Sequence, residues 1–202
     1  MKSRKYLQTF GLTALTLGAL ACAPRDEAGE TDTDLGAGAV EPEPDATTQD
    51  EPARARAELV GAPESGVSGS VEVTDDTGGV RVAVHVSGVE PIGPHAIHVH
   101  QTGDCAPPDF SSAGEHLNPE GAPHACPPTT PRHPGDLGNI EIVEGGDGHL
   151  ELTTDLLTVA EGPASVVGRA IVLHQGADDC TTQPSGDSGD LLACGVLESV
   201  ND

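Results

Sequence analysis

The sequence predicts a single all-β domain, a sandwich or barrel of eight short strands. Valine-rich runs alternate apolar and polar residues, turn-forming Gly, Pro, Asp and Thr separate these runs, and no segment has the period of an amphipathic helix. The expected strands are residues 57–61, 70–74, 79–87, 95–101, 139–143, 149–153, 167–174 and 193–199. Eight short strands at this spacing are typical of β-sandwiches and β-barrels.

The predicted core consists of aliphatic side chains. Beyond residue 21 the only aromatic residue is Phe110, so Val, Ile, Leu and Ala must fill the interior. Such a core is prone to cavities, and we therefore expect disulfides and metals to supply much of the stability. The connection 102–138 is long and lacks periodicity, which is typical of a functional loop.

Residues 1–21 are predicted to be a signal peptide of the lipoprotein type. Basic residues precede an apolar run that falls short of the roughly 20 residues needed to span a bilayer. The segment Ala19-Leu-Ala-Cys22 resembles a bacterial lipobox, in which Cys22 would become the lipid-bearing first residue. Ordinary signal cleavage near Ala21 or Ala23 is the alternative. We expect an extracytoplasmic protein anchored to a membrane by lipid, in the periplasm or at the cell surface.

Residues 22–56 are predicted to be an acidic, disordered linker, because they contain almost no large apolar side chain. The remaining residues, 57–202, have the length of one domain. The whole chain has a net charge of −24, and removal of residues 1–21 leaves six basic and 33 acidic residues, a net charge of −27. This charge excludes nucleic acid as a partner and opposes the approach of an anionic substrate.

Six histidines and one carboxylate form an ordered array that provides enough ligands for two adjacent metal ions. These residues are His98, His100, His116, His124, His133, Asp136 and His174. Neutral imidazole favours copper and zinc, and mixed nitrogen and oxygen ligands favour zinc. His98 and His100 alternate along a predicted strand, so both face the same side.

At these residues the chain resembles the copper–zinc superoxide dismutases, in particular their exported bacterial branch. The resemblance covers roughly residues 57 to 199. The matching blocks, in the family's order, are residues 95–100, 112–119, 132–138, 168–174, 177–179 and 193–196. The resemblance implies an eight-stranded, flattened Greek-key β-barrel with two long functional loops.

The resemblance also implies the ligands of both metals. Copper would take the four histidines that carry catalysis, His98, His100, His116 and His174. Zinc would take His116, His124, His133 and Asp136, so that His116 bridges the two ions. Asp178 matches an aspartate that joins His98 to His124 and holds both rings. The alternative for Asp178 is a loop carboxylate satisfied by local contacts.

If Cys22 carries lipid, four cysteines remain and three pairings are possible. The family pattern pairs Cys105 with Cys194, which leaves Cys126 with Cys180. Each residue of this second pair lies two positions after one member of the expected hydrogen bond between His124 and Asp178, so the two cysteines should be close in space. A metal-binding or free thiol at Cys126 or Cys180 is the alternative.

The remaining candidate residues are assigned minor roles. His95 matches a family histidine that bonds to backbone, and Arg132 and Arg169 match structural arginines. His85 and His149 are expected to be exposed to solvent. The resemblance leaves the oligomeric state open and is compatible with a homodimer.

The chain departs from the family pattern at Leu191, where relatives have an arginine that attracts superoxide and hydrogen-bonds to it. Residues 178–190 add four aspartates and no basic residue. We expect the dismutation of superoxide to O₂ and H₂O₂, with a lowered rate. The first alternative is a lipoprotein that sequesters copper without efficient turnover. The second is a structural β-domain with relic ligands.

Overall fold

The structure is a computed structural model in which residues 51–200 are described. Its elements are β1 (Arg54–Gly61), β2 (Ser68–Asp76), β3 (Gly79–Ser87), β4 (Gly93–His100), the 3₁₀ turn η1 (Ser111–Ala113), β5 (Asp136–Ile142), β6 (Gly148–Thr154), β7 (Ala170–His174), β8 (Leu191–Val196) and β9 (Glu198–Val200). The signal peptide, the lipidation residue Cys22 and the linker up to residue 50 lie outside the described residues.

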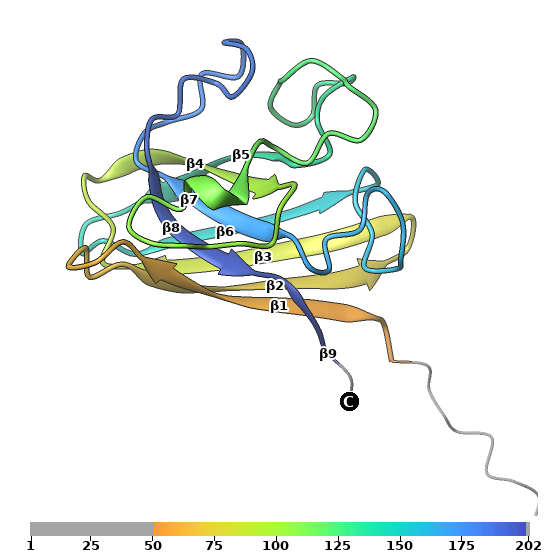
Figure 1. Cartoon of the computed structure of the whole chain (residues 1–202), viewed down its shortest axis with the longest axis horizontal. Coiled ribbons are helices and arrows are strands. Elements are labelled where there is room, and N and C mark those ends of the chain that lie inside the picture. Colours follow the sequence, from red (N-terminus) through yellow and green to blue (C-terminus); the bar gives the residue numbers. More distant parts are fainter. Residues whose placement is uncertain (1–50, 201–202) are drawn as a thin grey trace, which may run out of the picture. The chain divides into compact units, whose positions relative to one another are not determined.

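The strands form one antiparallel sheet in the order β2-β3-β6-β5-β4-β7-β8-β1-β9, and pairing of β1 with β2 closes it into a barrel (Figure 1). Strand β4 pairs with β5 and β7, while β3 pairs with β6. The chain therefore skips two strands between β3 and β4, as in a Greek key. The all-β barrel predicted from the sequence is confirmed.

The interior of the barrel is aliphatic. Alternate residues of β3 (Val80, Val82, Val84 and Val86) are buried, and the same alternation holds along β1. These side chains belong to one main cluster of Val, Leu, Ile and Ala. Phe110 is also buried, but it lies in a second, smaller cluster beside Cys194.

Most strand boundaries differ from the prediction by a few residues, and two of these differences have local reasons. Strand β1 begins at Arg54, so residues 54–56, which the sequence assigned to the linker, belong to the barrel. The buried Ala55 between two arginines gives too weak an apolar signal to reveal this. Strand β7 begins at Ala170 because Gly168 has a φ of 74°, a left-handed conformation that interrupts a strand.

The expected last strand, 193–199, is divided into β8 and β9 at Leu197. The Leu197 backbone bonds to Gly168 and Arg169, the residues just before β7. The eighth barrel strand is therefore followed by a short extension that pairs with β1.

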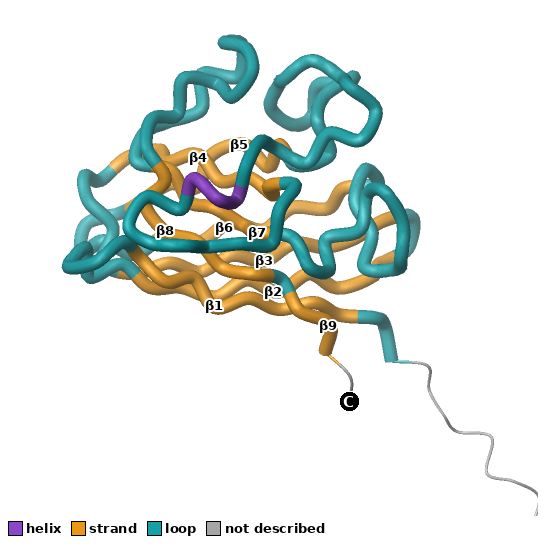
Figure 2. Tube along the Cα trace, in the orientation of Figure 1, coloured by secondary structure: helices purple, strands orange, loops and turns teal. Residues whose placement is uncertain are grey.

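Two long loops, residues 101–135 and 175–190, rise from the barrel beside β4 and β5 (Figure 2). They cover the outer side of β4, and residues 95–100 are buried on both faces as a result. Among the described residues no helix is long and apolar enough to cross a membrane.

Candidate metal centre

Strands β4 and β7 bring three candidate histidines together. Ile97 and Val99 of β4 pack in the main core, so His98 and His100 face the opposite side, under the loops. His174 is the last residue of β7, the strand beside β4. The pairing register shifts between Ala96 and His98, and such irregularities re-aim side chains next to functional sites.

We call His98, His100, His116 and His174 the four-histidine cluster, whose candidate ligand atoms all lie within 4.8 Å of one another. Three of the rings have an outer nitrogen that faces an oxygen acceptor. The contacts are His98 Nε2 to Asp178 Oδ2 at 2.9 Å, His100 Nδ1 to Gly114 O at 2.8 Å and His174 Nδ1 to Ser188 Oγ at 3.1 Å. The Ser188 hydroxyl donates its own proton to Ser185 O, so its oxygen can accept from His174.

The inner nitrogens of these rings therefore carry lone pairs, because a neutral imidazole has only one N–H. His98 Nδ1 and His174 Nε2 lie 3.0 Å apart, and His100 Nε2 and His174 Nε2 lie 3.4 Å apart. Lone pairs directed at a common point repel one another unless a cation lies between them. The geometry of the four-histidine cluster thus fits a metal ion.

Burial keeps these histidines in the form that binds metals. Desolvation lowers the pKa of His98 to about 4, of His100 to about 3 and of His174 to about 2. The charge of neighbouring histidines acts in the same direction. At neutral pH the three rings are therefore uncharged, as metal coordination requires.

We call His116, His124, His133 and Asp136 the three-histidine–aspartate cluster. The Nδ1 atoms of the three rings lie 2.8, 3.0 and 3.1 Å from the same oxygen, Asp136 Oδ1. Two atoms bound about 2.0 Å from a tetrahedral zinc ion are roughly 3.3 Å apart, so the spacing is close to that of four ligands around one ion. Backbone N–H groups of Ala125 and His133 hold the other carboxylate oxygen.

His116 belongs to both clusters. Its Nδ1 faces Asp136, while its Nε2 is buried and has no hydrogen-bond partner. His124 Nδ1 lies 3.0 Å from Asp136 Oδ1 but is not aligned for a hydrogen bond. A buried unpaired polar atom costs roughly 1–3 kcal/mol, and coordination of an ion would remove that cost. The loop that carries His116 is fixed against β4 by the bond from Leu117 N to Val99 O.

Asp178 links the two clusters. Its carboxylate accepts from His98 Nε2 and His124 Nε2, both at 2.9 Å, and from the backbone N–H of Cys180. Burial would raise the pKa of Asp178, but the hydrogen bonds from His98 and His124 outweigh burial and hold that pKa well below its usual range. Asp178 stays charged and fixes the tautomer of both rings.

Two amide side chains that sequence reasoning missed hold the backbone around this centre. Asn139 of β5 donates to Asp178 O and accepts from Asp178 N, at 3.0 and 2.7 Å. Gln183 accepts from His124 N and donates to His124 O, both at 2.8 Å. Each amide thus holds one residue by two bonds. Nothing in the local sequence distinguishes them from surface amides.

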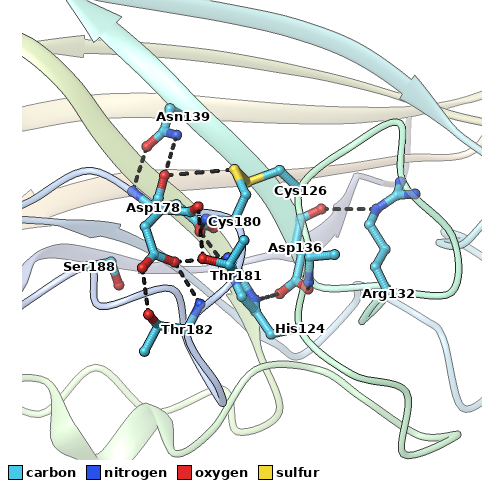
Figure 3. Close-up of a disulfide and its surroundings, with 12 residues drawn as sticks. His124, Cys126, Arg132, Asp136, Asn139, Asp178, Cys180, Thr181, Thr182 and Ser188 are labelled. Carbon is cyan, nitrogen blue, oxygen red and sulfur yellow. Dashed lines mark hydrogen bonds and ion pairs between the residues drawn. A yellow bond between two sulfur atoms is a disulfide. The ribbon is translucent and has the colours of Figure 1, made fainter.

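The structure contains the disulfides Cys105–Cys194 and Cys126–Cys180, the pairs expected from the resemblance. The first ties loop 101–135 to β8, and the second ties that loop to loop 175–190 (Figure 3). Cys126 and Cys180 are therefore neither free thiols nor metal ligands in this structure.

A cavity of about 280 Å³ opens over the clusters. Its walls include His100, His116 and His174, together with Glu115 and Leu191. Leu191 lies directly across from His174 in the β7–β8 pairing. Among the described residues no lysine or arginine lines this cavity, and Glu115 is the only carboxylate residue in its wall, so the mouth is negative.

The remaining sequence candidates belong to neither cluster, although His95 and Arg132 bond to the backbone of cluster residues His174 and Asp136. The two ring nitrogens of buried His95 face the carbonyl oxygens of His174 and Pro91. Arg132 bonds to Thr129 and Thr154, and Arg169 to Gln101 O. These contacts hold backbone and loops in place.

Fold and site together define a β-barrel protein with a buried centre for two metal ions. Residues 67–197 match the family model for copper/zinc superoxide dismutase. Over 148 residues the chain is 33% identical to "Superoxide dismutase [Cu-Zn] 2" of Aquifex aeolicus, a match that covers 71% of this chain and 86% of that protein. It is 39% identical over 148 residues to "Superoxide dismutase [Cu-Zn]" of Deinococcus radiodurans, covering 67% and 79%.

Among solved structures, the clock protein EA4 matches with a TM-score of 0.66 and 36% identity, over 73% of this chain and 94% of that one. The chain belongs to the copper/zinc superoxide dismutase family. The metals of this family are copper and zinc. The inward lone pairs of one cluster and the unpartnered His116 Nε2 and His124 Nδ1 fit such ions.

Proposed function

We propose that this protein dismutates superoxide at a histidine-bridged copper–zinc centre, at a rate limited by the negative charge at the mouth of its cavity. The observation that carries the proposal is the sharing of His116 between two buried ligand clusters, with Nε2 left unpartnered. The net reaction converts two superoxide ions and two protons into O₂ and H₂O₂.

In the proposed assignment, His98 Nδ1 and the Nε2 atoms of His100, His116 and His174 would hold copper. The Nδ1 atoms of His116, His124 and His133 and the carboxylate of Asp136 would hold zinc. This assignment agrees with the ring tautomers, because the opposite nitrogens of His98, His100, His124 and His174 already have oxygen partners.

Copper, when bound, supplies the one-electron redox chemistry that takes an electron from one superoxide and gives an electron to another. The residues supply the rest. His116 Nε2 is the buried nitrogen available to hold and release a proton beside the substrate. Asp178 keeps the N–H groups of His98 and His124 directed away from the metals. The loops and disulfides confine the substrate to the cavity above His100 and His174.

The electrostatics of the mouth work against the substrate. Superoxide is an anion, the chain has a net charge of −24, and the cavity wall offers Glu115 and Leu191 instead of a cation. Electrostatic steering of a charged substrate changes its association rate by about 10- to 1,000-fold. We therefore expect kcat/KM to lie one to three decades below the diffusional ceiling of roughly 10⁸–10⁹ M⁻¹s⁻¹.

Pulse radiolysis of the copper–zinc protein tests this proposal, with zinc-only protein as the matched control. The zinc-only protein keeps both clusters filled and lacks the redox ion. Copper–zinc protein should accelerate superoxide decay well above this control. Decay equal to that of the control would overturn the proposal.

The second candidate is a copper-binding protein without efficient turnover, favoured by the negative, cation-free wall of the cavity. This function predicts tight retention of copper together with superoxide decay equal to that of the zinc-only control. A structural domain with relic ligands would instead lose both metals on dialysis.

The location at a membrane is also a proposal, and it rests on the lipobox-like segment that ends at Cys22. Superoxide that arises outside the cytoplasm would then be the substrate, with the domain held at the membrane by lipid. Mass spectrometry of the mature N-terminus tests this. A lipid-modified Cys22 that is lost in Cys22→Ala would support it, and an unmodified N-terminus would contradict it.

A further inference from the structure

Two histidines that belong to neither cluster face each other on the outer surface of the barrel. His85 of β3 is paired directly with His149 of β6, and both side chains are exposed. Their ring centroids are 4.3 Å apart with an interplanar angle of 30°. Strands β6 and β5 separate β3 from β4, so this pair is distinct from the metal centre. We call these two residues the β3–β6 histidine pair.

One member of the pair is already oriented as a metal ligand. His149 Nδ1 lies 3.1 Å from the carbonyl oxygen of Val84. The ring N–H donates to that carbonyl, which leaves the lone pair on Nε2. Histidines that bind metals commonly donate their other N–H to a backbone carbonyl, because this bond fixes the ring and its tautomer.

The surroundings of the pair attract cations. Glu141 and Asp147 line the same surface hollow as His85 and His149. The exposed Glu58 lines the hollow on the other side of the pair.

Two arginines also lie in that second hollow, and each has an acidic partner. Arg56 pairs with Glu72 at 2.6 Å, and Arg81 approaches Glu151 at 3.6 Å. The charges of both arginines are therefore offset locally, which leaves the carboxylates of Glu58, Glu141 and Asp147 in excess around the pair.

We propose that the β3–β6 histidine pair is a second, surface metal site that binds aqueous Cu(II) through one ring nitrogen of each histidine. Directly opposed residues on neighbouring strands have Cβ atoms about 4.5–5.5 Å apart, which allows two imidazoles to reach one ion. Water completes the coordination. Cu(II) is the preferred ion because it heads the affinity order of divalent first-row metals at nitrogen ligands.

At this site a metal ion should exchange with solvent more readily than at the buried centre. Its ligands are exposed and come from two strands of a preformed sheet, so an ion can enter and leave without movement of the loops. The inference does not rest on the proposed dismutation, because neither histidine contributes to either cluster. It gives the protein a solvent-facing copper site in addition to its buried one.

The experiment is a titration of Cu(II) into copper–zinc-loaded protein, in which the buried clusters are already filled. Calorimetry should show one further equivalent, and electron paramagnetic resonance should show coupling to two imidazole nitrogens. His85→Gln and His149→Gln should each weaken this binding. Removal of a residue that only orients a metal ligand typically lowers metal affinity roughly 10- to 100-fold. Removal of either histidine should lower the affinity for Cu(II) by at least that factor.

Glu58→Gln is the matched control, since it removes a charge from the same surface and leaves both imidazoles. It should retain the further equivalent and the two-nitrogen signal. Four results would overturn the site: no further equivalent, an unchanged equivalent in both histidine variants, loss in only one of them, or equal loss in Glu58→Gln. Unchanged circular dichroism of the exposed variants confirms that the barrel is folded.

Discussion

The substitution Leu191→Arg tests most directly whether charge at the cavity mouth limits the rate. Leu191 lines the cavity together with His100, His116 and His174, and it is paired across the sheet with His174. A guanidinium at this position would face an anion that enters the cavity. The substitution adds one positive charge to a wall in which, within residues 51–200, Glu115 is the only acidic or basic residue other than histidine.

The size of the effect follows from the separation of the charges. Two opposite unit charges about 4 Å apart attract by about 1 kcal/mol in water and about 4 kcal/mol at the effective dielectric constant near a protein surface. Since 1.4 kcal/mol is a factor of ten, this range corresponds to roughly 5- to 1,000-fold, which overlaps the range expected for steering. We expect kcat/KM for superoxide to rise at least about tenfold.

The local packing can accommodate the larger side chain. Leu191 is only partly buried and packs at the edge of the small cluster around Phe110 and Val172. The aliphatic stem of an arginine can cover the same apolar surface while its charged end reaches the cavity. Leu191→Gln is the matched control, because it has a polar end and no charge.

Pulse radiolysis over a range of ionic strengths provides the assay, and the sign of the salt dependence is the decisive result. Salt screens attraction and repulsion alike. The rate of the arginine variant should gain less from salt than the wild type, or fall, whereas the wild-type rate should rise as repulsion by the acidic surface is screened. A Leu191→Arg rate equal to that of Leu191→Gln, with the same salt dependence, would refute the electrostatic explanation.

The remaining predictions concern metal retention and stability. Asp178→Ala removes the acceptor of two ring N–H groups and should weaken metal binding by roughly 10- to 100-fold, as measured by metal content after dialysis against chelators; unchanged content would contradict the bridging role. Cys126→Ser combined with Cys180→Ser opens a disulfide with a sequence separation of 54 and should lower the free energy of unfolding by about 4 kcal/mol in the chain-entropy model, as measured by urea denaturation. A loss below about 1 kcal/mol would show that the metals or the amide bonds already fix the loops. The metal-free protein should lose stability as the pH falls below about 6.5, because the unfolded chain binds protons that His98 does not accept in the folded state until about pH 4. Each buried histidine of this kind contributes about 1.4 kcal/mol per pH unit in that window, and a flat urea midpoint from neutral pH to pH 4 would contradict the lowered pKa values.

The fold was predictable because one face of each strand is buried. The alternation of valines along β3 specifies both the strand and the side that enters the core. The beginning of β1 was missed because Ala55 carries little hydrophobic signal between Arg54 and Arg56. Boundaries of this kind depend on pairing partners, here β2 and β9, which local periodicity does not identify.

The candidate ligands were predictable because histidine is uncommon and few other roles explain an ordered set of six. The supporting amides were not. Asn139 and Gln183 hold Asp178 and His124 across sequence separations of 39 and 59 residues, and amides are common in loops and on surfaces. Only the tertiary arrangement shows that each amide bonds to both the backbone N–H and the backbone C=O of one residue.

The loops around the centre are held in place by polar contacts and a disulfide, and bound metals would add to these. Loop 175–190 is rich in Asp, Gly, Ser and Thr, and its buried residues, Asp178, Gly186 and Ser188, include no apolar side chain. Apolar burial therefore contributes little to holding it. A disulfide, the Asp178 carboxylate and the Gln183 amide join it to loop 101–135 and to β4 instead. Since this same loop forms one wall of the cavity, we expect the shape of the cavity to change when the metal clusters are emptied.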